Sequence, residues 1–174
     1  SSIRGGSALW DSVSTIAGGG FNLINSNASG SVIAGGVDNA IGTNAYQSSI
    51  GGGKTNMVSA PHGTIAGGLF NRVTGGGAFI GGGGYNGDNS LIDFGNTASG
   101  MGSVIAGGTV NTAGGSRSVV GGGHSNAATN QYATVPGGAW NLAGGQGSLA
   151  AGRAAKALHA GTFVWSDDWT PDFV

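Results

Sequence analysis

Ten single apolar residues recur along this chain at a nearly constant spacing, and nine of them are followed by a Gly-Gly pair. The phrase SVIAGG shows the pattern and occurs twice, at residues 31–36 and 103–108. We call the apolar residue the anchor of a repeat and count positions from it, so that Gly-Gly falls at +2 and +3. The ten anchors, most of them 15 residues apart, are Ile3, Ile16, Ile33, Ile50, Ile65, Ile80, Ile105, Val120, Val135 and Ala150.

A second constant feature of the repeat is an Asn at position +6, usually followed two residues later by a small apolar residue. Eight consecutive repeats carry this Asn: Asn22, Asn39, Asn56, Asn71, Asn86, Asn111, Asn126 and Asn141. A period of 15 residues is too short for a pair of helices, but it fits two short strands joined by two tight turns. Gly and Asn supply the positive φ angles that such turns require.

This repeat predicts an all-β fold, a parallel β-roll or β-solenoid of about ten 15-residue rungs. Alternate residues of a strand point to opposite faces, so anchors such as Ile33 and Ile105 are expected to fill the core. Asn residues such as Asn39 and Asn111 are expected to stack as an amide ladder along one edge. The core of each rung is thin, which favours burial of one apolar face against further copies of the chain.

Departures from the repeat indicate its boundaries. In the last repeat, Arg153 replaces the second Gly and Lys156 replaces the Asn, as expected of a polar capping rung. We therefore predict a β-roll domain over residues 1–156 and a C-terminal cap or connector over 157–174. Four aromatic residues of this tail are expected to close the open end of the core or to join a following domain: Phe163, Trp165, Trp169 and Phe173.

Composition narrows the function classes. The chain of 174 residues has 40 Gly, a formal net charge of −1 and only 7% charged residues. With 39% hydrophobic residues it departs from the low hydrophobicity and high net charge of disordered chains. It has no basic stripe for nucleic acid, no Cys, and no apolar run long enough to insert into a membrane. We expect no cofactor.

The rungs SVIAGGVDNAIG and SVIAGGTVNTAGG resemble the YadA-like head repeats of trimeric autotransporter adhesins, which also recur in bacteriophage tail fibres. The resemblance covers Ile3 to about Lys156. It implies a left-handed parallel β-roll, a homotrimer, and a role in attachment outside the cell, on a bacterial surface or a phage virion. The stretch AAGRAAKALHAGTFVWSDD resembles segments that precede C-terminal intramolecular chaperone domains of phage-type fibres.

Position +5 is the most informative variable position. It should lie in a polar turn, yet four of its eight residues are aromatic: Phe21, Phe70, Tyr85 and Trp140. Stacked rungs would align these side chains along one edge as an apolar stripe. Such a stripe is explained either by packing between subunits or by contact with a receptor or glycan.

The interval from Ile80 to Ile105 is ten residues longer than usual, so GDNSLIDFGN is predicted to loop out of one turn. Insertions of this kind often lie on a binding face. Asp88 and Asp93 share this loop and are candidate ligand-binding residues. Two acids at a suitable distance could act on a glycosidic bond or hold Ca²⁺ with neighbouring Asn side chains, whereas simple solvation is the plainer interpretation.

Two further patterns carry less chemistry. The stretch GGGKT at 51–55 resembles part of a phosphate-binding loop but lacks the earlier Gly and a following helical pattern, so we interpret it as a turn. His62 and His124 are too far apart along the axis to share a site within one chain, and His159 lies in the tail. We expect solvated residues at all three positions; the alternative is a trimer axis that brings three copies of one His together.

The sequence thus predicts a non-enzymatic, extracellular attachment protein, a trimeric fibre or adhesin head that binds a cell-surface receptor or glycan. A purely structural fibre spacer is the alternative within the same class. An ice-binding solenoid and a polysaccharide-acting β-solenoid are alternatives from other classes, although regular rows of Thr on one face are missing.

Overall fold

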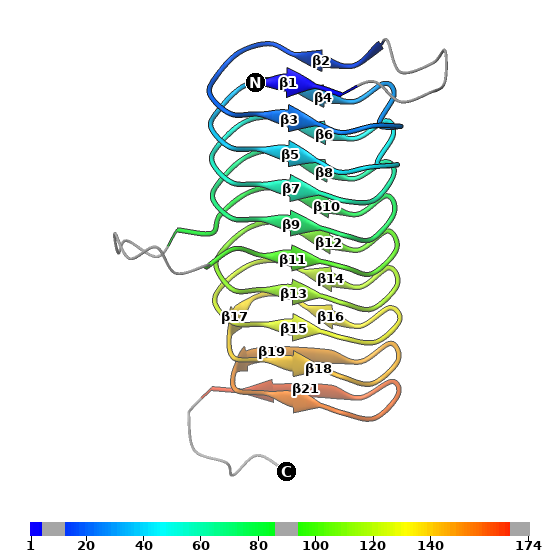
Figure 1. Ribbon diagram of the computed structural model, residues 1–174. Helices are drawn as coiled ribbons and strands as arrows, with labels where there is room; N and C mark the ends of the chain where they lie inside the picture. Colours follow the sequence, from blue (N-terminus) through cyan, green and yellow to red (C-terminus); the bar gives the residue numbers. More distant parts are fainter. Residues whose placement is uncertain (5–12, 86–93, 168–174) are drawn as a thin grey trace.

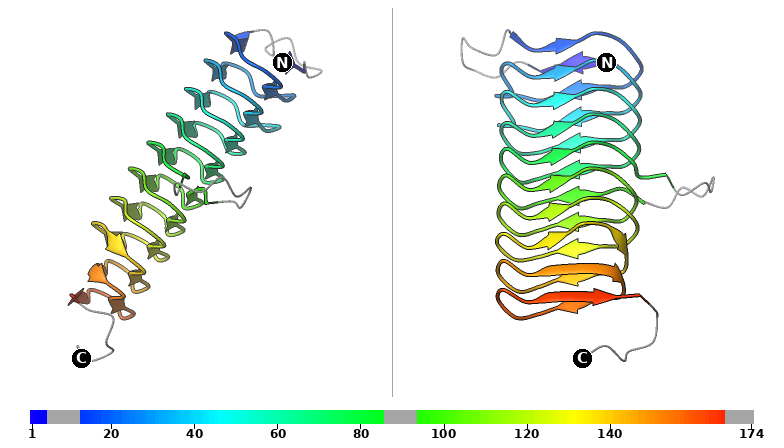
Figure 2. Two further views of the ribbon diagram at one scale, coloured as in Figure 1. Left: turned by 90° about the vertical axis from the view of Figure 1, so that its left-hand side faces the viewer. Right: turned by 180° about the vertical axis from the view of Figure 1, so that it is seen from behind.

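The structure, a computed structural model, describes residues 1–4, 13–85 and 94–167. The chain winds into a stack of rungs in which each turn contributes one strand to each of two parallel sheets (Figure 1). Figure 2 shows the two sheets on opposite sides of the rod that these rungs form. The predicted all-β parallel β-solenoid of about ten turns of about 15 residues is confirmed. Within the described residues no helix is long and apolar enough to cross a membrane.

Eight of the ten described strands of sheet A directly follow an Asn. The strands of this sheet are β1 (Ser2–Ile3), β3 (Leu23–Ile24), β5 (Ala40–Ile41), β7 (Met57–Val58), β9 (Arg72–Val73), β11 (Thr97–Ala98), β13 (Thr112–Ala113), β15 (Ala127–Ala128), β18 (Leu142–Ala143) and β20 (Lys156–Ala157).

Eight of the eleven described strands of sheet B end on an anchor. The strands of this sheet are β2 (Thr15–Ile16), β4 (Val32–Ile33), β6 (Ser49–Ile50), β8 (Thr64–Ile65), β10 (Phe79–Ile80), β12 (Val104–Ile105), β14 (Val119–Val120), β16 (Thr134–Val135), β17 (Gly138–Ala139), β19 (Leu149–Arg153) and β21 (Phe163–Ser166).

The anchors stack in register and form the core, as predicted. Ile33 pairs with Ile50, and Ile80 pairs with Ile105 across the insertion. Ile33 and Ile105 are fully buried. Ile3 is the exception, because it pairs with Ile24 in sheet A and is 44% exposed. Ile3 therefore belongs to the second strand of a rung and is not an anchor. The sequence did not distinguish the two positions, because Ile3 is followed by Gly-Gly as the anchors are.

Each rung has a tight turn between its sheet B strand and the sheet A strand that follows, and we call it the first turn. Its geometry explains the Gly-Gly pair. Gly68, the second Gly of its pair, has a φ of 92°, and a Cβ there would overlap the carbonyl oxygen of Gly83 in the next rung. Gly67, the first Gly, has open space where its Cβ would lie. Only the second position thus requires glycine on both counts, backbone conformation and close approach.

The Asn ladder is present and buried in the interior of the first turn. The Nδ2 of Asn39 donates to the Oδ1 of Asn22 at 3.2 Å and to the carbonyl oxygen of Gly53 at 3.0 Å. The backbone N–H of Asn111 donates to the Oδ1 of Asn96 at 3.0 Å. The members are Asn22, Asn39, Asn56, Asn71, Asn96, Asn111, Asn126 and Asn141.

Asn96 takes the ladder position that the sequence assigned to Asn86. Its N–H donates to the Oδ1 of Asn71 at 3.0 Å, and β11, which follows it, pairs with β9 and β13. Asn86 lies outside the described residues. The inserted residues therefore precede the ladder Asn and do not follow it.

The repeat extends beyond Lys156, the boundary predicted from the sequence. Gly152 pairs with Gly138, so the last rung is one residue shorter and Arg153 stands opposite Ala139. The N–H of Ala155 donates to the Oδ1 of Asn141 at 2.9 Å. Ala155, not Lys156, therefore replaces the ladder Asn and ends the amide chain.

The aromatic tail does not plug the core in its described part. Strand β21 continues sheet B by pairing with β19, and its alternation points Val164 and Ser166 inward. Phe163 and Trp165 fall on the outward positions and are 66% and 61% exposed. Trp169 and Phe173 lie outside the described residues.

Candidate binding surface

The +5 side chains project from the first turn in an unusual backbone conformation. Phe21, Phe70 and Trp140 have φ angles of 57°, 57° and 58°. This left-handed conformation is uncommon for residues other than Gly and Asn. We call the row of residues that directly precede a ladder Asn, or Ala155 in its place, the first-turn edge: Phe21, Asp38, Thr55, Phe70, Gly95, Val110, Ser125, Trp140 and Ala154.

The aromatic members of this edge are aligned but do not form the continuous stripe expected from the sequence. Phe21 is 81% exposed and stands three rungs from Phe70, with Asp38 and Thr55 between them. Trp140 is four rungs beyond Phe70. At about 4.8 Å per rung, the aromatic rings are well separated along the axis.

Tyr85 is not part of the edge. The N–H of Gly84 donates to the carbonyl oxygen of Gly108 at 2.9 Å, and the N–H of Val110 donates to that of Phe94 at 3.0 Å. The chain therefore leaves the rung after Gly84 and has rejoined it by Phe94. Gly95, directly before the ladder Asn96, takes the +5 place predicted for Tyr85. The predicted binding residues Asp88 and Asp93 lie outside the described residues.

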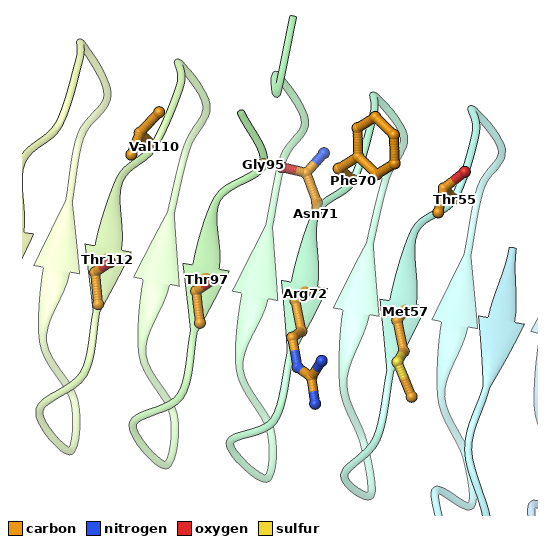
Figure 3. Close-up of a pocket in the computed structure, with 9 residues that line it drawn as sticks. All are labelled: Thr55, Met57, Phe70, Asn71, Arg72, Gly95, Thr97, Val110 and Thr112. Atoms are coloured by element: carbon orange, nitrogen blue, oxygen red, sulfur yellow. The ribbon is translucent and has the colours of Figure 1, made fainter. Parts of the chain in front are cut away.

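The absence of a side chain at Gly95 opens a groove in the first-turn edge, with a volume of about 380 Å³. Figure 3 shows two rows of lining residues, one on the edge and one on the strands of sheet A below it. We call this hollow the Gly95 groove; its lining residues are Thr55, Met57, Phe70, Asn71, Arg72, Gly95, Thr97, Val110 and Thr112.

The groove combines apolar walls with a polar floor. Phe70 and Val110 flank the gap on the edge, and the outward side chains of β9, β11 and β13 supply Arg72, Thr97 and Thr112 (Figure 3). Arg72 is exposed, and its guanidinium makes no hydrogen bond or ion pair with any residue that the structure describes. The charged residues within the strands of sheet A are Arg72 and Lys156, both basic. The floor therefore offers one unsatisfied cation among hydroxyl groups.

A second cluster lies on the same side of the rod near the C-terminal rungs. The Oγ1 of Thr109 and the Nδ1 of His124 form a 2.8 Å hydrogen bond. The His124 ring meets the Trp140 ring edge to face at 5.4 Å, and the guanidinium carbon of Arg153 lies 5.0 Å from the centre of the Trp140 ring. Trp140 is thus held by neighbours on both sides.

Sequence reasoning missed both arrangements. The cluster depends on His124, which is at +4, and on Arg153, which stands opposite the +4 residue Ala139. Both lie beside Trp140, the +5 residue of a neighbouring rung. His62 is exposed on the turn that leads from sheet A to sheet B, opposite the first turn, and its ring lies 5.1 Å from that of Tyr46. Among the described residues no three His, Cys, Asp or Glu side chains are grouped to hold a metal ion.

Comparison with models of known protein families finds no match for the chain, and comparison with curated proteins finds none either.

Proposed function

We propose that this chain is a non-enzymatic, extracellular attachment protein, the head of a homotrimeric fibre or adhesin on a bacterial surface or a phage virion. The observation that carries the proposal is the Gly95 groove, which interrupts an otherwise regular first-turn edge. A scaffold of constant buried residues there presents variable side chains to solvent, and a hollow with both apolar and polar lining lies among them.

Sheet B supports the homotrimer in this proposal. Its outward positions from β2 to β16 carry no charge and include Val32, Phe79 and Val119, which are all exposed. The next outward position of each rung is a small residue or Pro, as in Ala34, Gly51 and Pro136. A flat, uncharged face with exposed apolar side chains is typical of a surface that is covered in the assembled protein.

Attachment then acts through multivalency. Three copies of the groove, held rigidly in one fibre, bind a surface with an avidity far above the affinity of each copy, because the second and third contacts are intramolecular. Shallow grooves of this size bind weakly one at a time. The rod keeps the copies at a fixed separation.

The experiment measures adhesion of the labelled full chain to bacterial and animal cells, together with its mass by light scattering. The wild type is expected to bind saturably. The double variant Phe70→Asn, Trp140→Asn removes both aromatic rings and keeps residues that tolerate a positive φ; it is expected to bind at least tenfold more weakly at unchanged mass.

Two outcomes contradict the proposal. A wild type that binds no cell surface favours the structural spacer. A double variant that loses its trimer mass assigns these aromatic residues to packing between subunits.

A further inference from the structure

The Gly95 groove has the dimensions of a site for one small ring. Phe70 and Val110 stand two rungs apart, which separates their backbones by about 10 Å. The volume of about 380 Å³ lies at the lower end of the range for small-molecule sites, about 300–1,000 Å³. The described residues leave the groove open along the edge, so a ring at the end or in the middle of a longer chain can enter between them.

The floor of the groove is chemically complementary to a ligand with hydroxyl groups. Thr97 and Thr112 are outward neighbours in register on β11 and β13. Neither hydroxyl makes a hydrogen bond to a residue that the structure describes. A hydroxyl both donates and accepts, and two of them side by side match the vicinal hydroxyls of a sugar.

The wall formed by Phe70 matches the remaining surface of a sugar. The face of an aromatic ring carries partial negative charge and attracts the partially positive C–H groups of a pyranose. Phe70 is held at the edge by its backbone, since its N–H donates to the carbonyl oxygen of Lys54 at 3.1 Å. The ring therefore borders the groove from a backbone position that is tied to the neighbouring rung.

Arg72 adds a preference for one negative charge. Its guanidinium is planar and binds a carboxylate through two parallel hydrogen bonds. The acids that the structure describes are Asp38, two rungs from Phe70, and Asp167 at the far end of the rod. No described carboxylate therefore competes for Arg72.

We infer that the Gly95 groove binds a pyranose that carries one carboxylate, with the sugar face on Phe70, its hydroxyls on Thr97 and Thr112, and its carboxylate on Arg72. This inference rests on the proposed attachment function and names the chemical class of its ligand. The uronic acid units of surface polysaccharides have this chemistry.

The test is a ligand-observed NMR titration of the full chain with methyl glucuronide, methyl glucoside and glucose 6-sulfate. Methyl glucuronide is expected to bind at least tenfold more tightly than methyl glucoside. Arg72→Gln should abolish this difference without changing the mass of the assembly. Arg117→Gln, which removes an equal charge from the opposite turn, is the matched control and should preserve it. Phe70→Asn should weaken both sugars alike.

Three results would overturn the inference. Equal binding of glucuronide and glucoside removes the role of the charge, and tighter binding of the sulfate contradicts a carboxylate ligand. Dissociation of the assembly by Arg72→Gln makes the groove a subunit interface. A chain that adheres to cells without preferring glucuronide refutes only this inference, whereas one that binds glucuronide through Arg72 and adheres to no cell refutes only the attachment function.

Discussion

The side-chain oxygen of Asn39 accepts two hydrogen bonds from Asn56, one from its backbone N–H at 3.0 Å and one from its Nδ2 at 3.1 Å. The same Nδ2 donates to the carbonyl oxygen of Gly52 at 3.0 Å, within its own rung. The Oδ1 of Asn56 accepts from the N–H of Asn71 at 3.0 Å. One buried amide thus joins three consecutive rungs.

Replacement of a ladder Asn should therefore destabilise the solenoid strongly. Asn56→Ala leaves the N–H of Asn71 and the carbonyl oxygen of Gly52 without these partners, and each unpaired buried group costs about 1–3 kcal/mol. We expect the free energy of unfolding to fall by about 3 kcal/mol in urea denaturation. Gln146→Ala removes an exposed amide and should change it by less than about 0.5 kcal/mol. A loss below about 1 kcal/mol in Asn56→Ala would show that the ladder contributes little.

The two glycines of one pair should differ sharply in their response to Ala. Gly68→Ala places a Cβ against the carbonyl oxygen of Gly83 and 2.7 Å from the Nδ2 of Asn71, at a positive φ. We expect it to lower the free energy of unfolding by about 3 kcal/mol or to prevent folding. Gly67→Ala meets open space and should be tolerated. Circular dichroism and thermal melting of the two variants side by side measure the difference, and equal melting temperatures would refute it.

The left-handed conformation of the first-turn edge is a source of strain that substitution can relieve. Val110 has a φ of 59° and is 38% exposed, whereas Val119 is 37% exposed and lies in strand β14. Val110→Asn should raise the free energy of unfolding by about 1 kcal/mol, because Asn tolerates this conformation better than a β-branched residue. Val119→Asn should lower it by up to about 1 kcal/mol, because Val is favoured in strands.

Equal effects in these two Val variants, measured by urea denaturation, would mean that exposure and not backbone conformation governs the edge. Opposite signs would assign the effect to the backbone conformation at each site, left-handed at Val110 and extended at Val119, since the substitution and the exposed fraction are matched.

The buried parts of the repeat were predictable from the sequence for a physical reason. A rung that stacks on similar neighbours constrains the same interior position in every rung. The buried residues therefore recur at a fixed spacing in the sequence, as Ile33, Ile105, Asn39 and Asn111 do. The handedness of the solenoid and its oligomeric state do not place a particular residue type at a fixed position of each repeat, so the repeat does not predict them.

The phase of the insertion was not predictable. Asn86 and Asn96 stand ten residues apart, and each follows a residue that suits the turn. Only the pairing of β11 with its neighbours decides between them. The Gly95 groove was not predictable for the same reason, because it lies where one side chain is missing from the first-turn edge and residues from three further rungs meet.

The uncharged face of sheet B predicts which surface would hold the proposed homotrimer together. Val119→Lys places a charge at the centre of this face, near β12 and β16, whose outward residues Val104 and Thr134 are uncharged. If three copies bury this face, the charge has no described acid to pair with, and an unpaired buried charge is strongly unfavourable. Light scattering should then show monomers. Ala127→Lys makes the same change on sheet A, in the next strand along the chain, and should leave the trimer intact. Trimers in both variants would move the interface to another face, and a monomeric wild type would refute the homotrimer itself.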